Sequence, residues 1–412
     1  MLKSLDIKLA NIHADLARAK DFILADAKDA DMATGLAATG KDAVTGKQRS
    51  LAEYRDQMRE VVRQGLVDIM LMSASTMDLL AIKQRLFIDS HVTPAVRAND
   101  TTDIHLPAGG TYAAEPSRPF RTATIEQLMS GKVNPGREEM RLGADLGLYS
   151  ITPNNKLEFD YPTLLAYKEF RIEAEAKGFR HFLEVFDPNA CGDHCPADLG
   201  RFVNDLIVRT LAGVPSANRP VFLKIAYHGP KAMEELASYD PHLVPGVLGG
   251  SSGTTHDAFK LLEEAKRHGA RAALFGRKIN NCEHQLAFVR YLRAIADGEV
   301  QAEAAVRAYH GELQKLGIRP YRELKSDLEL TSTATSYAGT GSVVSMAGAA
   351  EKKNTGGTPL PPVPTKADGS PDFKKMTAAQ KVAYARERIK GDLARGNGDG
   401  NGGGGSSRVR RA

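Results

Sequence analysis

The sequence predicts an α/β fold, a (β/α)8 barrel followed by a disordered C-terminal tail. Short apolar runs alternate with amphipathic helical patterns between residues 22 and 296, which indicates a parallel sheet with crossover helices. The chain has 412 residues, more than one barrel of about 250 residues requires. After about residue 330 it becomes rich in Gly, Ser, Thr and Pro, so we expect the barrel to end near there.

The first half of the barrel is predicted from four apolar runs. Branched and aromatic residues bounded by turn residues indicate strands at 22–25, 67–72, 92–98 and within 142–151. Apolar residues at helical spacing predict helices over 51–64, around 79–87 and over 163–177. A long insertion at 105–119 carries Gly109 and Gly110, and we expect it to form an active-site lid or an oligomer contact.

The second half repeats this pattern with shorter connections. Strands are predicted over 181–186, over 221–226, in the run that begins at 243, and over 270–279. Helices are predicted over 257–268, 283–296 and 302–315. The last of them closes the domain.

Lys224 stands in the middle of the sixth apolar run, RPVFLKIAYHG over residues 219–229. Burial disfavours the charged form of a lysine and lowers its pKa. A neutral amine is a nucleophile that can attack a carbonyl and form a Schiff base. Lys224 is therefore the candidate nucleophile. A lysine that only pairs with a carboxylate, or that reaches a barrel end, is the structural alternative.

Two loops after the seventh and eighth strands have the composition of a phosphate site. The run LVPGVLGGSSGTT contains Gly249, Gly250 and Ser251, and the run ARAALFGRKI contains Gly276 and Arg277. Glycines let backbone N–H groups approach an anion closely, and the N-terminus of the following helix favours negative charge. An arginine binds phosphate through two hydrogen bonds, and barrels often build a phosphate site from these two loops.

With this order of lysine strand, GGSSGTT loop and FGRK loop, the chain resembles the class I (Schiff-base) aldolases of the (β/α)8 type over roughly residues 178–279. It is similar to their tagatose-bisphosphate, sulfosugar-phosphate and archaeal-type fructose-bisphosphate branches. The resemblance implies that Lys224 forms the Schiff base and that Gly249, Gly250, Gly276 and Arg277 bind phosphate. It also implies a reaction without metal or cofactor beyond the covalent Schiff base.

Glu184 lies between two apolar residues in the fifth strand, HFLEVFDP. This pattern predicts a carboxylate that points into the barrel mouth with a shifted pKa. The resemblance to the tagatose and sulfosugar branches implies that Glu184 is the acid/base of carbon–carbon cleavage, whereas a tyrosine has that role in the archaeal branch. Tyr227 and Tyr149 keep the tyrosine alternative open, and a carboxylate that only pairs with Lys224 is a further alternative.

Charged residues also follow the first and third strands. Asp26 and Lys28 stand where the tagatose-type relatives carry an aspartate and a basic residue, and the resemblance implies a contact to a sugar hydroxyl or to a lysine. A solvated acidic loop is the alternative. Arg97 and Asp100 are weaker candidates of the same kind. The fourth strand lacks the lysine that these relatives often have, which argues against the phosphorylated substrate of the tagatose branch.

The composition fits a soluble, cytoplasmic enzyme, and the resemblance implies a role in carbohydrate metabolism. No apolar run reaches the roughly 18 residues of a membrane span, and the N-terminus lacks a signal-peptide core. A net charge of +5 is too small to indicate a nucleic-acid partner. The chain has an odd number of cysteines, namely Cys191, Cys195 and Cys282, which suits a protein of a reducing compartment. Residues 191–195, CGDHC, have zinc-ligand types without the usual spacing, so we interpret them as an active-site loop and predict no metal.

We divide the chain into a barrel over 1–325, a flexible Gly/Pro/Ser/Thr-rich linker over 326–375 and a final segment over 376–412. In the final segment a short amphipathic helix is predicted over 376–393, with Thr377 as its N-cap, before a basic, glycine-rich end. Such a helix is marginal in water, so we expect it to form on a protein partner. A solubilising tail without a partner is the alternative. Because the motif residues precede Asn280, truncation after Ile318 or Lys325 is expected to leave kcat unchanged.

Together these residues predict a class I aldolase, an aldehyde-lyase that cleaves or forms a carbon–carbon bond in a phosphorylated sugar or keto compound. Lys224 forms an iminium that acts as an electron sink, and Glu184 moves the proton of the reacting hydroxyl. We expect a homo-oligomer without nucleic-acid or membrane partners. A transaldolase or a deoxyribose-phosphate-type aldolase is the alternative among enzymes, and a non-catalytic phosphate-binding barrel is the alternative outside them.

Overall fold

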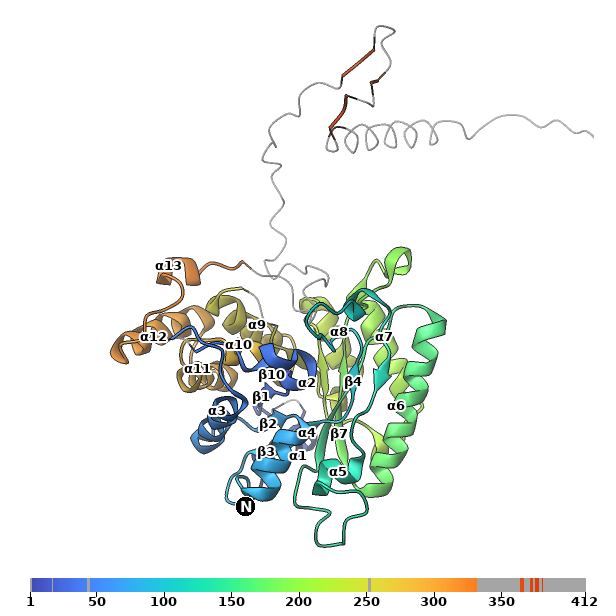
Figure 1. Cartoon of the computed structure of the whole chain (residues 1–412), viewed down its shortest axis with the longest axis vertical. Helices are drawn as coiled ribbons and strands as arrows, with labels where there is room; N and C mark the ends of the chain where they lie inside the picture. Colours follow the sequence, from blue (N-terminus) through green and yellow to red (C-terminus); the bar gives the residue numbers. More distant parts are fainter. Residues whose placement is uncertain are drawn as a thin grey trace, which may run out of the picture. The chain divides into compact units, whose positions relative to one another are not determined.

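The computed structural model describes residues 2–16, 18–42, 45–250 and 253–331, together with a few tail positions at 364–366, 371–372, 375–377 and 380. Its contacts divide the chain into two units, Met1–Met346 and Ala347–Ala412. The first unit contains a closed parallel barrel of eight strands surrounded by helices (Figure 1). The predicted (β/α)8 fold is therefore confirmed.

Little of the second unit falls within the described residues. Thr365 and Pro371 form an isolated antiparallel bridge. The backbone N–H of Gln380 donates to the hydroxyl of Thr377 at 3.3 Å, as expected if Thr377 caps a helix. The rest of the predicted helix, residues 381–393, lies outside the described residues.

The barrel strands pair in the order β1-β10-β9-β8-β7-β6-β3-β2, so strands that follow one another along the barrel part of the chain lie side by side. The barrel closes at β1, where Ile23 pairs with Ala272 of β10 and Ala25 pairs with Ile69 of β2. The eight strands are β1 (Ile23–Lys28), β2 (Ile69–Met72), β3 (Thr93–Arg97), β6 (Leu146–Ile151), β7 (Arg180–Val185), β8 (Leu223–Ile225), β9 (Gly246–Leu248) and β10 (Ala272–Phe275).

Successive residues of each strand face alternately the barrel interior and the helices outside. In β6, Leu146 and Leu148 belong to the apolar cluster inside the barrel. Tyr149 faces outward, where its ring stacks on Phe170 with centroids 4.4 Å apart. The next inward position, Ser150, is buried and polar. The interior thus changes from apolar to polar toward the C-terminal ends of the strands, which is where barrels place their active sites.

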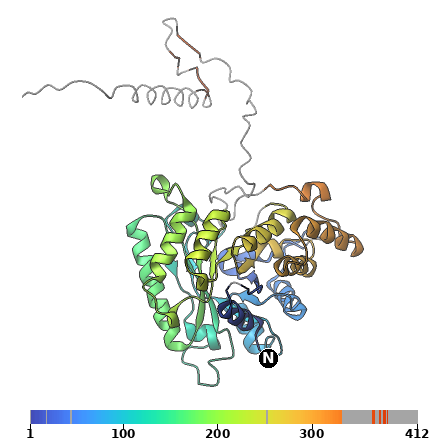
Figure 2. The same ribbon diagram turned by 180° about the vertical axis from the view of Figure 1, so that it is seen from behind.

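Long helices cover the outside of the barrel (Figures 1 and 2). Helix α3 begins at a capping box formed by Ser50 and Glu53 and ends at Gly65, whose left-handed backbone has a φ of 70°. The helices predicted over 51–64 and 302–315 are confirmed. The long helices are α3 (Leu51–Gln64), α6 (Leu157–Lys177), α7 (Leu199–Leu211), α8 (Pro230–Tyr239), α9 (Thr255–Arg267), α11 (Gln285–Asp297) and α12 (Ala302–Lys315).

Shorter elements connect the strands to this outer layer. The helix predicted around 79–87 begins earlier, as α4, and continues as a π-helical turn over Asp78–Lys83. The short helices are α2 (Ala30–Ala33), α4 (Ala74–Met77), α5 (Ile125–Ser130), α10 (Arg277–Asn280) and α13 (Leu324–Asp327). No helix in the described part of the chain has the length and apolar character that a membrane crossing requires.

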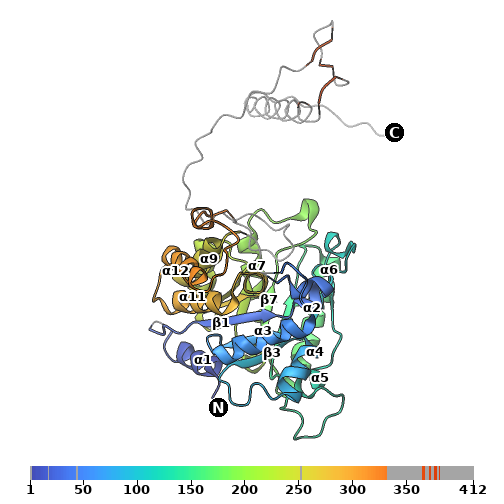
Figure 3. The same ribbon diagram turned by 60° about the vertical axis from the view of Figure 1, so that its left-hand side comes forward.

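Helix α1 (Ser4–Ala14), which the sequence analysis did not predict, closes the N-terminal end of the barrel. It is the dark blue helix near the N-terminus in Figure 2, and Figure 3 shows it below β1. Its Leu5, Leu9 and Ile12 pack into the apolar cluster inside the barrel. The helix therefore forms an apolar floor, and access to the interior is left to the opposite end.

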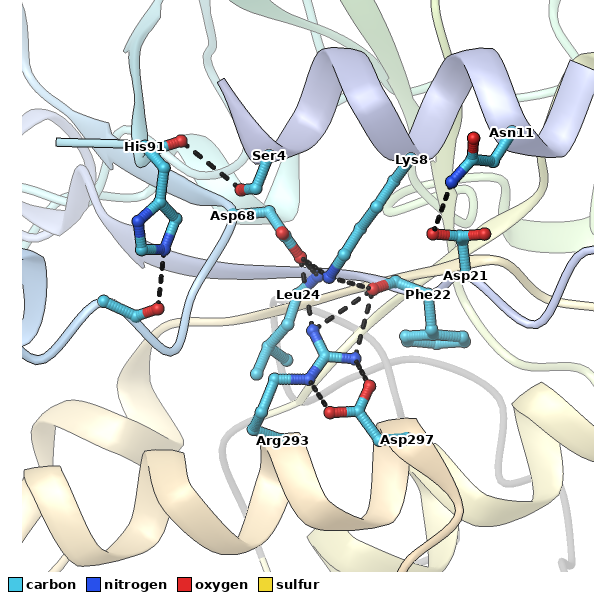
Figure 4. Close-up of polar contacts among 11 residues, drawn as sticks. Ser4, Lys8, Asn11, Asp21, Phe22, Leu24, Asp68, His91, Arg293 and Asp297 are labelled. Carbon is cyan, nitrogen blue, oxygen red and sulfur yellow. Dashed lines mark hydrogen bonds and ion pairs between the residues drawn. The ribbon is translucent and has the colours of Figure 1, made fainter. Parts of the chain in front are cut away.

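A buried ion network fixes this floor (Figure 4). Asp68 Oδ2 lies 2.8 Å from Lys8 Nζ of α1 and 3.2 Å from Arg293 of α11. The same oxygen accepts the backbone N–H of Leu24 in β1 at 2.8 Å. Arg293 also donates to the carbonyl oxygen of Phe22 at 3.2 Å. One carboxylate therefore joins the floor helix, the last barrel helix and the first strand.

Candidate active site

Lys224 and Glu184 face each other inside the barrel mouth. They are direct partners in the register between β7 and β8. Lys224 Nζ lies 2.6 Å from Glu184 Oε1, and the two side chains are 6% and 0% exposed. The sequence analysis predicted both as inward residues, and the structure brings them together as a buried ion pair.

Arg97, the last residue of β3, supports this pair. A terminal nitrogen of its guanidinium lies 3.7 Å from Glu184 Oε2. The other terminal nitrogen donates to the Ser150 hydroxyl at 3.2 Å, and that hydroxyl donates to Glu184 Oε2 at 2.6 Å. One carboxylate oxygen of Glu184 is thus held by Arg97 and Ser150, and the other faces Lys224.

Two aspartates complete the buried charges. Arg97 Nε lies 2.5 Å from Asp29 Oδ2. Burial alone would raise the pKa of Asp29, but the Arg97 and Lys224 charges outweigh it and lower that pKa below its usual range, so Asp29 stays ionised. Asp100 lies 3.9 Å from Arg97. Its burial raises its pKa to about 6 although Arg97 opposes the shift, so Asp100 titrates near neutrality.

A cavity of about 40 Å³ lies between these charges and the two glycine loops. Asp29, Arg97 and Lys224 line it on one side. The loop residues that line it are Gly249, Gly250, Gly276 and Arg277. The predicted phosphate residues therefore share a cavity with the predicted nucleophile, apart from Ser251, which lies outside the described residues.

The glycines of the seventh loop also have a packing reason. A Cβ on Gly249 would lie 2.2 Å from the ring of Phe275, and Gly250 has a φ of +62°. Only a residue without a side chain fits the first position, and the second favours glycine. The GG pair therefore reflects the tight turn above β9 as well as any approach of an anion.

Asp26 and Lys28 do not reach this cavity, which corrects their predicted role at the site. The inward residues of the first strand are Ala25 and Ala27, so Asp26 and Lys28 face the helices. Lys28 Nζ donates to Gln285 Oε1 of α11 at 2.7 Å and lies 3.8 Å from Asp26 Oδ2. Burial raises the pKa of Asp26 to about 6 against the opposing charge of Lys28. The acidic residue that the first strand supplies to the cavity is Asp29.

The two candidate tyrosines also lie in the outer layer. Tyr149 and Tyr227 both belong to the apolar cluster between strands and helices. Burial raises the pKa of Tyr227, and the charges of Glu264 and Glu234 on α9 and α8 add to the shift. Neither ring lines the cavity, so the structure does not support a tyrosine as the acid/base or Tyr227 as a catalytic residue.

The sequence analysis missed Ser150 and Asn99. Ser150 is the inward residue that follows Leu146 and Leu148, so the period of two along β6 is the signal that could have found it. Asn99 accepts the backbone N–H of Ser150 at 2.7 Å and donates to its carbonyl oxygen at 2.8 Å. Beyond the end of β3, the Asn99 side chain thus makes the two hydrogen bonds to β6 that a strand backbone would otherwise make. No local sequence motif predicts this role.

The insertion after β3 covers the barrel mouth. It begins with β4 (Asp100–Thr101), which pairs antiparallel with β5 (Pro119–Phe120). Between them, buried Ile104 packs with inward Ala226 and Leu248 above the lysine. The backbone N–H of Leu106 donates to Ala33 at the end of α2 at 2.7 Å. Of the two predicted roles, a lid and an oligomer contact, these contacts support the lid.

Cys191 and Cys195 form a disulfide across the 3₁₀ turn Gly192–His194. The structure thus pairs the two sulfur atoms with each other, which replaces both the zinc alternative and the interpretation of these cysteines as free thiols in a reducing compartment. Cys282 is free and buried. The disulfide lies in the loop after β7, the strand that carries Glu184.

Comparison with known proteins agrees with this architecture. A fructose-bisphosphate aldolase from Slackia heliotrinireducens superimposes with a TM-score of 0.53 at 14% identity, over 76% of this chain and 92% of that one. The chain shares its barrel fold with this aldolase. An archaeal fructose-1,6-bisphosphate aldolase, solved with its catalytic lysine covalently bound to the carbinolamine intermediate, has a TM-score of 0.50 at 15% identity over 71% of this chain and 100% of that one.

Barrels with other activities match as well. An orotidine 5'-phosphate decarboxylase from Pyrococcus horikoshii has a TM-score of 0.37 at 11% identity, over 66% of this chain and 99% of that one. No protein-family model and no curated protein matches the sequence. The structural neighbours include the Schiff-base aldolases that the sequence resembles, and at these identities the likeness shows the fold.

Proposed function

We propose that the protein is a class I aldolase whose Lys224 forms a Schiff base with a phosphorylated keto compound. The observation that carries the proposal is the buried contact of 2.6 Å between Lys224 and Glu184, together with the cavity that Lys224 lines with the two glycine loops. A buried lysine needs a reason to be there, and a neighbouring carboxylate can receive the proton that it must lose before it attacks.

The reaction follows from this pair. Lys224 passes a proton to Glu184, and the neutral amine attacks the substrate carbonyl to give a carbinolamine. Loss of water leaves an iminium, which draws electrons from the neighbouring carbon–carbon bond. A carboxylate then takes the proton of the hydroxyl on the departing carbon, the bond breaks, and an aldehyde and an enamine on Lys224 result. Protonation and hydrolysis of the enamine release the second product and regenerate the lysine.

The surrounding charges suit this sequence. Arg97 and Ser150 orient Glu184, so its second oxygen is aimed at the amine. Asp29 stays ionised and can accept a hydrogen bond from a substrate hydroxyl. Arg97 already faces three carboxylates, those of Asp29, Asp100 and Glu184, and Lys224 reacts with the substrate carbonyl. Arg277, on the eighth loop, is then the cation assigned to phosphate, which favours a substrate with a single phosphate group.

Trapping tests the proposal directly. Wild-type protein incubated with dihydroxyacetone phosphate and borohydride should gain one reduced adduct, while Lys224→Met should gain none. The matched control is Lys231→Met, a lysine of α8 whose side chain is 87% exposed, and it should be trapped like wild type. An adduct that persists in Lys224→Met, or none in the wild type, contradicts the assignment.

One observation favours a second candidate, a non-catalytic phosphate-binding barrel. The cavity has a volume of only about 40 Å³. A protein of this kind would bind inorganic phosphate at Arg277 without forming an adduct, so calorimetry beside the trapping experiment separates the two functions.

A further inference from the structure

We infer that residues 322–331, the segment that follows α12 and includes α13, form a clamp that positions the phosphate loop after β9. This inference rests on the proposed phosphate site, because it assigns Arg322 and Asp327 as positioning residues for that site. The sequence analysis placed its domain boundary at residue 325, inside this segment. Figure 1 shows α13 beyond α12, on the side of the barrel where α9 lies.

The clamp holds the end of the loop by its backbone. Arg322 donates to the carbonyl oxygen of Gly253 at 2.7 Å. Lys278, the neighbour of Arg277 on α10, donates to the same oxygen at 2.7 Å. Two cations from two separate segments thus converge on one carbonyl. The seventh and eighth loops, which together supply the predicted phosphate residues, are tied to each other and to the clamp at this point.

The clamp also occupies the start of α9. Asp327 is buried, and its Oδ1 accepts the backbone N–H of Thr255, the first residue of α9, at 2.7 Å. Its Oδ2 lies 2.9 Å from His310 Nε2 of α12. A carboxylate at a helix N-terminus is stabilised by the unsatisfied N–H groups there. This corrects the expectation that the phosphate binds at this helix start, because Asp327 takes that place.

Three further contacts continue along the same seam. The hydroxyl of Thr254 donates to the carbonyl oxygen of Glu329 at 2.8 Å. The ring of His256 hydrogen-bonds the carbonyl oxygen of Leu328 at 2.7 Å. The backbone N–H and the hydroxyl of Thr331 each donate to Asp257 at 2.9 Å. The segment therefore follows the turn from the loop into α9 residue by residue.

The two ends of the loop after β9 are therefore held in different ways. Gly249 follows β9 directly and packs on Phe275, whereas Gly253 and the start of α9 are held by the clamp. A binding loop must hold its geometry to within about 0.5 Å to bind well. Loss of the clamp should therefore weaken the binding of phosphate and leave the chemistry at Lys224 unaffected.

The test uses the full-length chain with Arg322→Ala and with the double variant Arg322→Ala/Asp327→Ala. Arg319→Ala is the matched control, an exposed arginine three residues earlier for which the described residues record no hydrogen bond or ion pair. Adduct formation is followed with dihydroxyacetone phosphate and with unphosphorylated dihydroxyacetone. The half-saturating concentration of the phosphorylated compound should rise about tenfold in the double variant and about threefold in Arg322→Ala, as expected for lost hydrogen bonds.

The rate at saturation, the values for dihydroxyacetone and all values of Arg319→Ala should stay at wild-type level. Equal increases for both compounds, or no increase in either clamp variant, would overturn the inference. If the double variant does not fold, the Arg322→Ala variant, whose substitution lies at an exposed position, still tests the inference. Calorimetry with inorganic phosphate needs no chemistry at Lys224, so it still tests the clamp if the aldolase proposal fails. A phosphate affinity equal to wild type in the clamp variants would then overturn it.

Discussion

In the proposed mechanism Lys224 and Glu184 act as a pair, and proton transfer to Glu184 controls when Lys224 reacts. At rest Lys224 Nζ lies 2.6 Å from Glu184 Oε1. A substrate that enters the cavity displaces this contact, and the proton then has one short path, to Glu184. Glu184 then gives this proton to the carbinolamine hydroxyl as water leaves, and the restored carboxylate can take the proton of a substrate hydroxyl. One residue would thus serve both proton transfers.

Glu184→Gln should separate these two roles. The amide keeps the size of the side chain and its contact to Ser150 but cannot take up a proton, so turnover should fall by about 100-fold or more. Borohydride trapping at Lys224 should still occur at long incubation times, since water can remove the proton slowly. Turnover close to that of wild type would show that another group is the acid/base.

The residues at the centre of the site were predictable and those at its edge were not. Lys224 and Glu184 each stand between apolar neighbours in a short strand, so burial and direction follow from the alternation. The first strand ends in ADAKDAD, which offers acidic residues on both faces, and the local pattern cannot select between Asp26 and Asp29. The roles of Ser150 and Asn99 depend on contacts with residues of neighbouring strands, such as Arg97 and Glu184, so the local sequence does not predict them.

At the scale of elements, β1 carries two different buried charge groups on its two faces. Asp29 and Arg97 belong to the cavity, whereas Asp26 and Lys28 lie against α10 and α11. Among the described residues, the hydrogen bond of Lys28 to Gln285 and its ion pair with Asp26 involve no residue that lines the cavity. Asp26→Asn/Lys28→Met should therefore leave the turnover of the enzyme unchanged. A loss of turnover in a folded variant would place the outer pair in the mechanism after all.

The single variant Asp26→Asn, which leaves Lys28 in place, tests the pKa of Asp26. Its pKa is raised from 3.8 to about 6 by burial, so its ionisation opposes folding, and this penalty grows as the pH rises from about 4 through 6. The difference corresponds to roughly 3 kcal/mol at higher pH. Urea denaturation at pH 5 and pH 8 should show that this variant gains stability over wild type at both pH values, with a gain about twice as large at pH 8 as at pH 5. An equal difference at both pH values would contradict the raised pKa.

The floor of the barrel depends on one carboxylate. Asp68→Asn removes the charge that Lys8 and Arg293 share and leaves Lys8 without its carboxylate partner, while Arg293 keeps Asp297, so the variant should lose about 2 kcal/mol of unfolding free energy. Asp297→Asn is the control, because its side chain is 43% exposed and its ion pair with Arg293 should contribute less than about 1 kcal/mol. Equal losses in the two variants would show that α1 is held by its apolar face alone.

Elements were predicted well where their apolar pattern is complete within the element. The barrel strands and helices α3 and α12 are of this kind. Helix α1 was missed because its Leu5, Leu9 and Ile12 form only a narrow apolar face in a charged segment. This face stabilises a helix only when it packs against the apolar interior of the barrel. The π-helical turn after α4 shifts the helical period and displaces the predicted element.

At the scale of the whole molecule, the barrel unit extends beyond the predicted boundary at residue 325. Asp327 is buried and Leu328 packs on the main core, so a chain that ends at Ile318 or Lys325 cuts into the barrel unit. A chain that ends at Met346, the boundary between the two units, should keep the turnover of the full-length protein.

A chain that ends at Ile318 should instead lose affinity for phosphorylated ligands by about tenfold or more, because it lacks the clamp. That truncation after Ile318 leaves kcat unchanged stays a prediction, which the loss of affinity does not contradict. Steady-state kinetics of the two truncated proteins, with circular dichroism to verify folding, provide the comparison. Loss of turnover in the Met346 truncation would assign a role in catalysis to the second unit.

The fold follows from features that tolerate large changes in sequence. Structural neighbours at 14–15% identity keep the same barrel. What distinguishes this chain at the barrel mouth is a small set of side chains, namely Lys224, Glu184, Arg97 and Asp29, and the loops that meet them. This likeness shows the fold, and the proposed Schiff-base chemistry rests on the buried pair of Lys224 and Glu184.

The most direct measurement is peptide mapping of the full-length protein after reduction with borohydride in the presence of dihydroxyacetone phosphate. The account predicts one modified residue, Lys224, and protection of that residue by inorganic phosphate. Modification of a different buried lysine, such as Lys28 or Lys278, or an unmodified Lys224 in protein shown to bind phosphate, would contradict it.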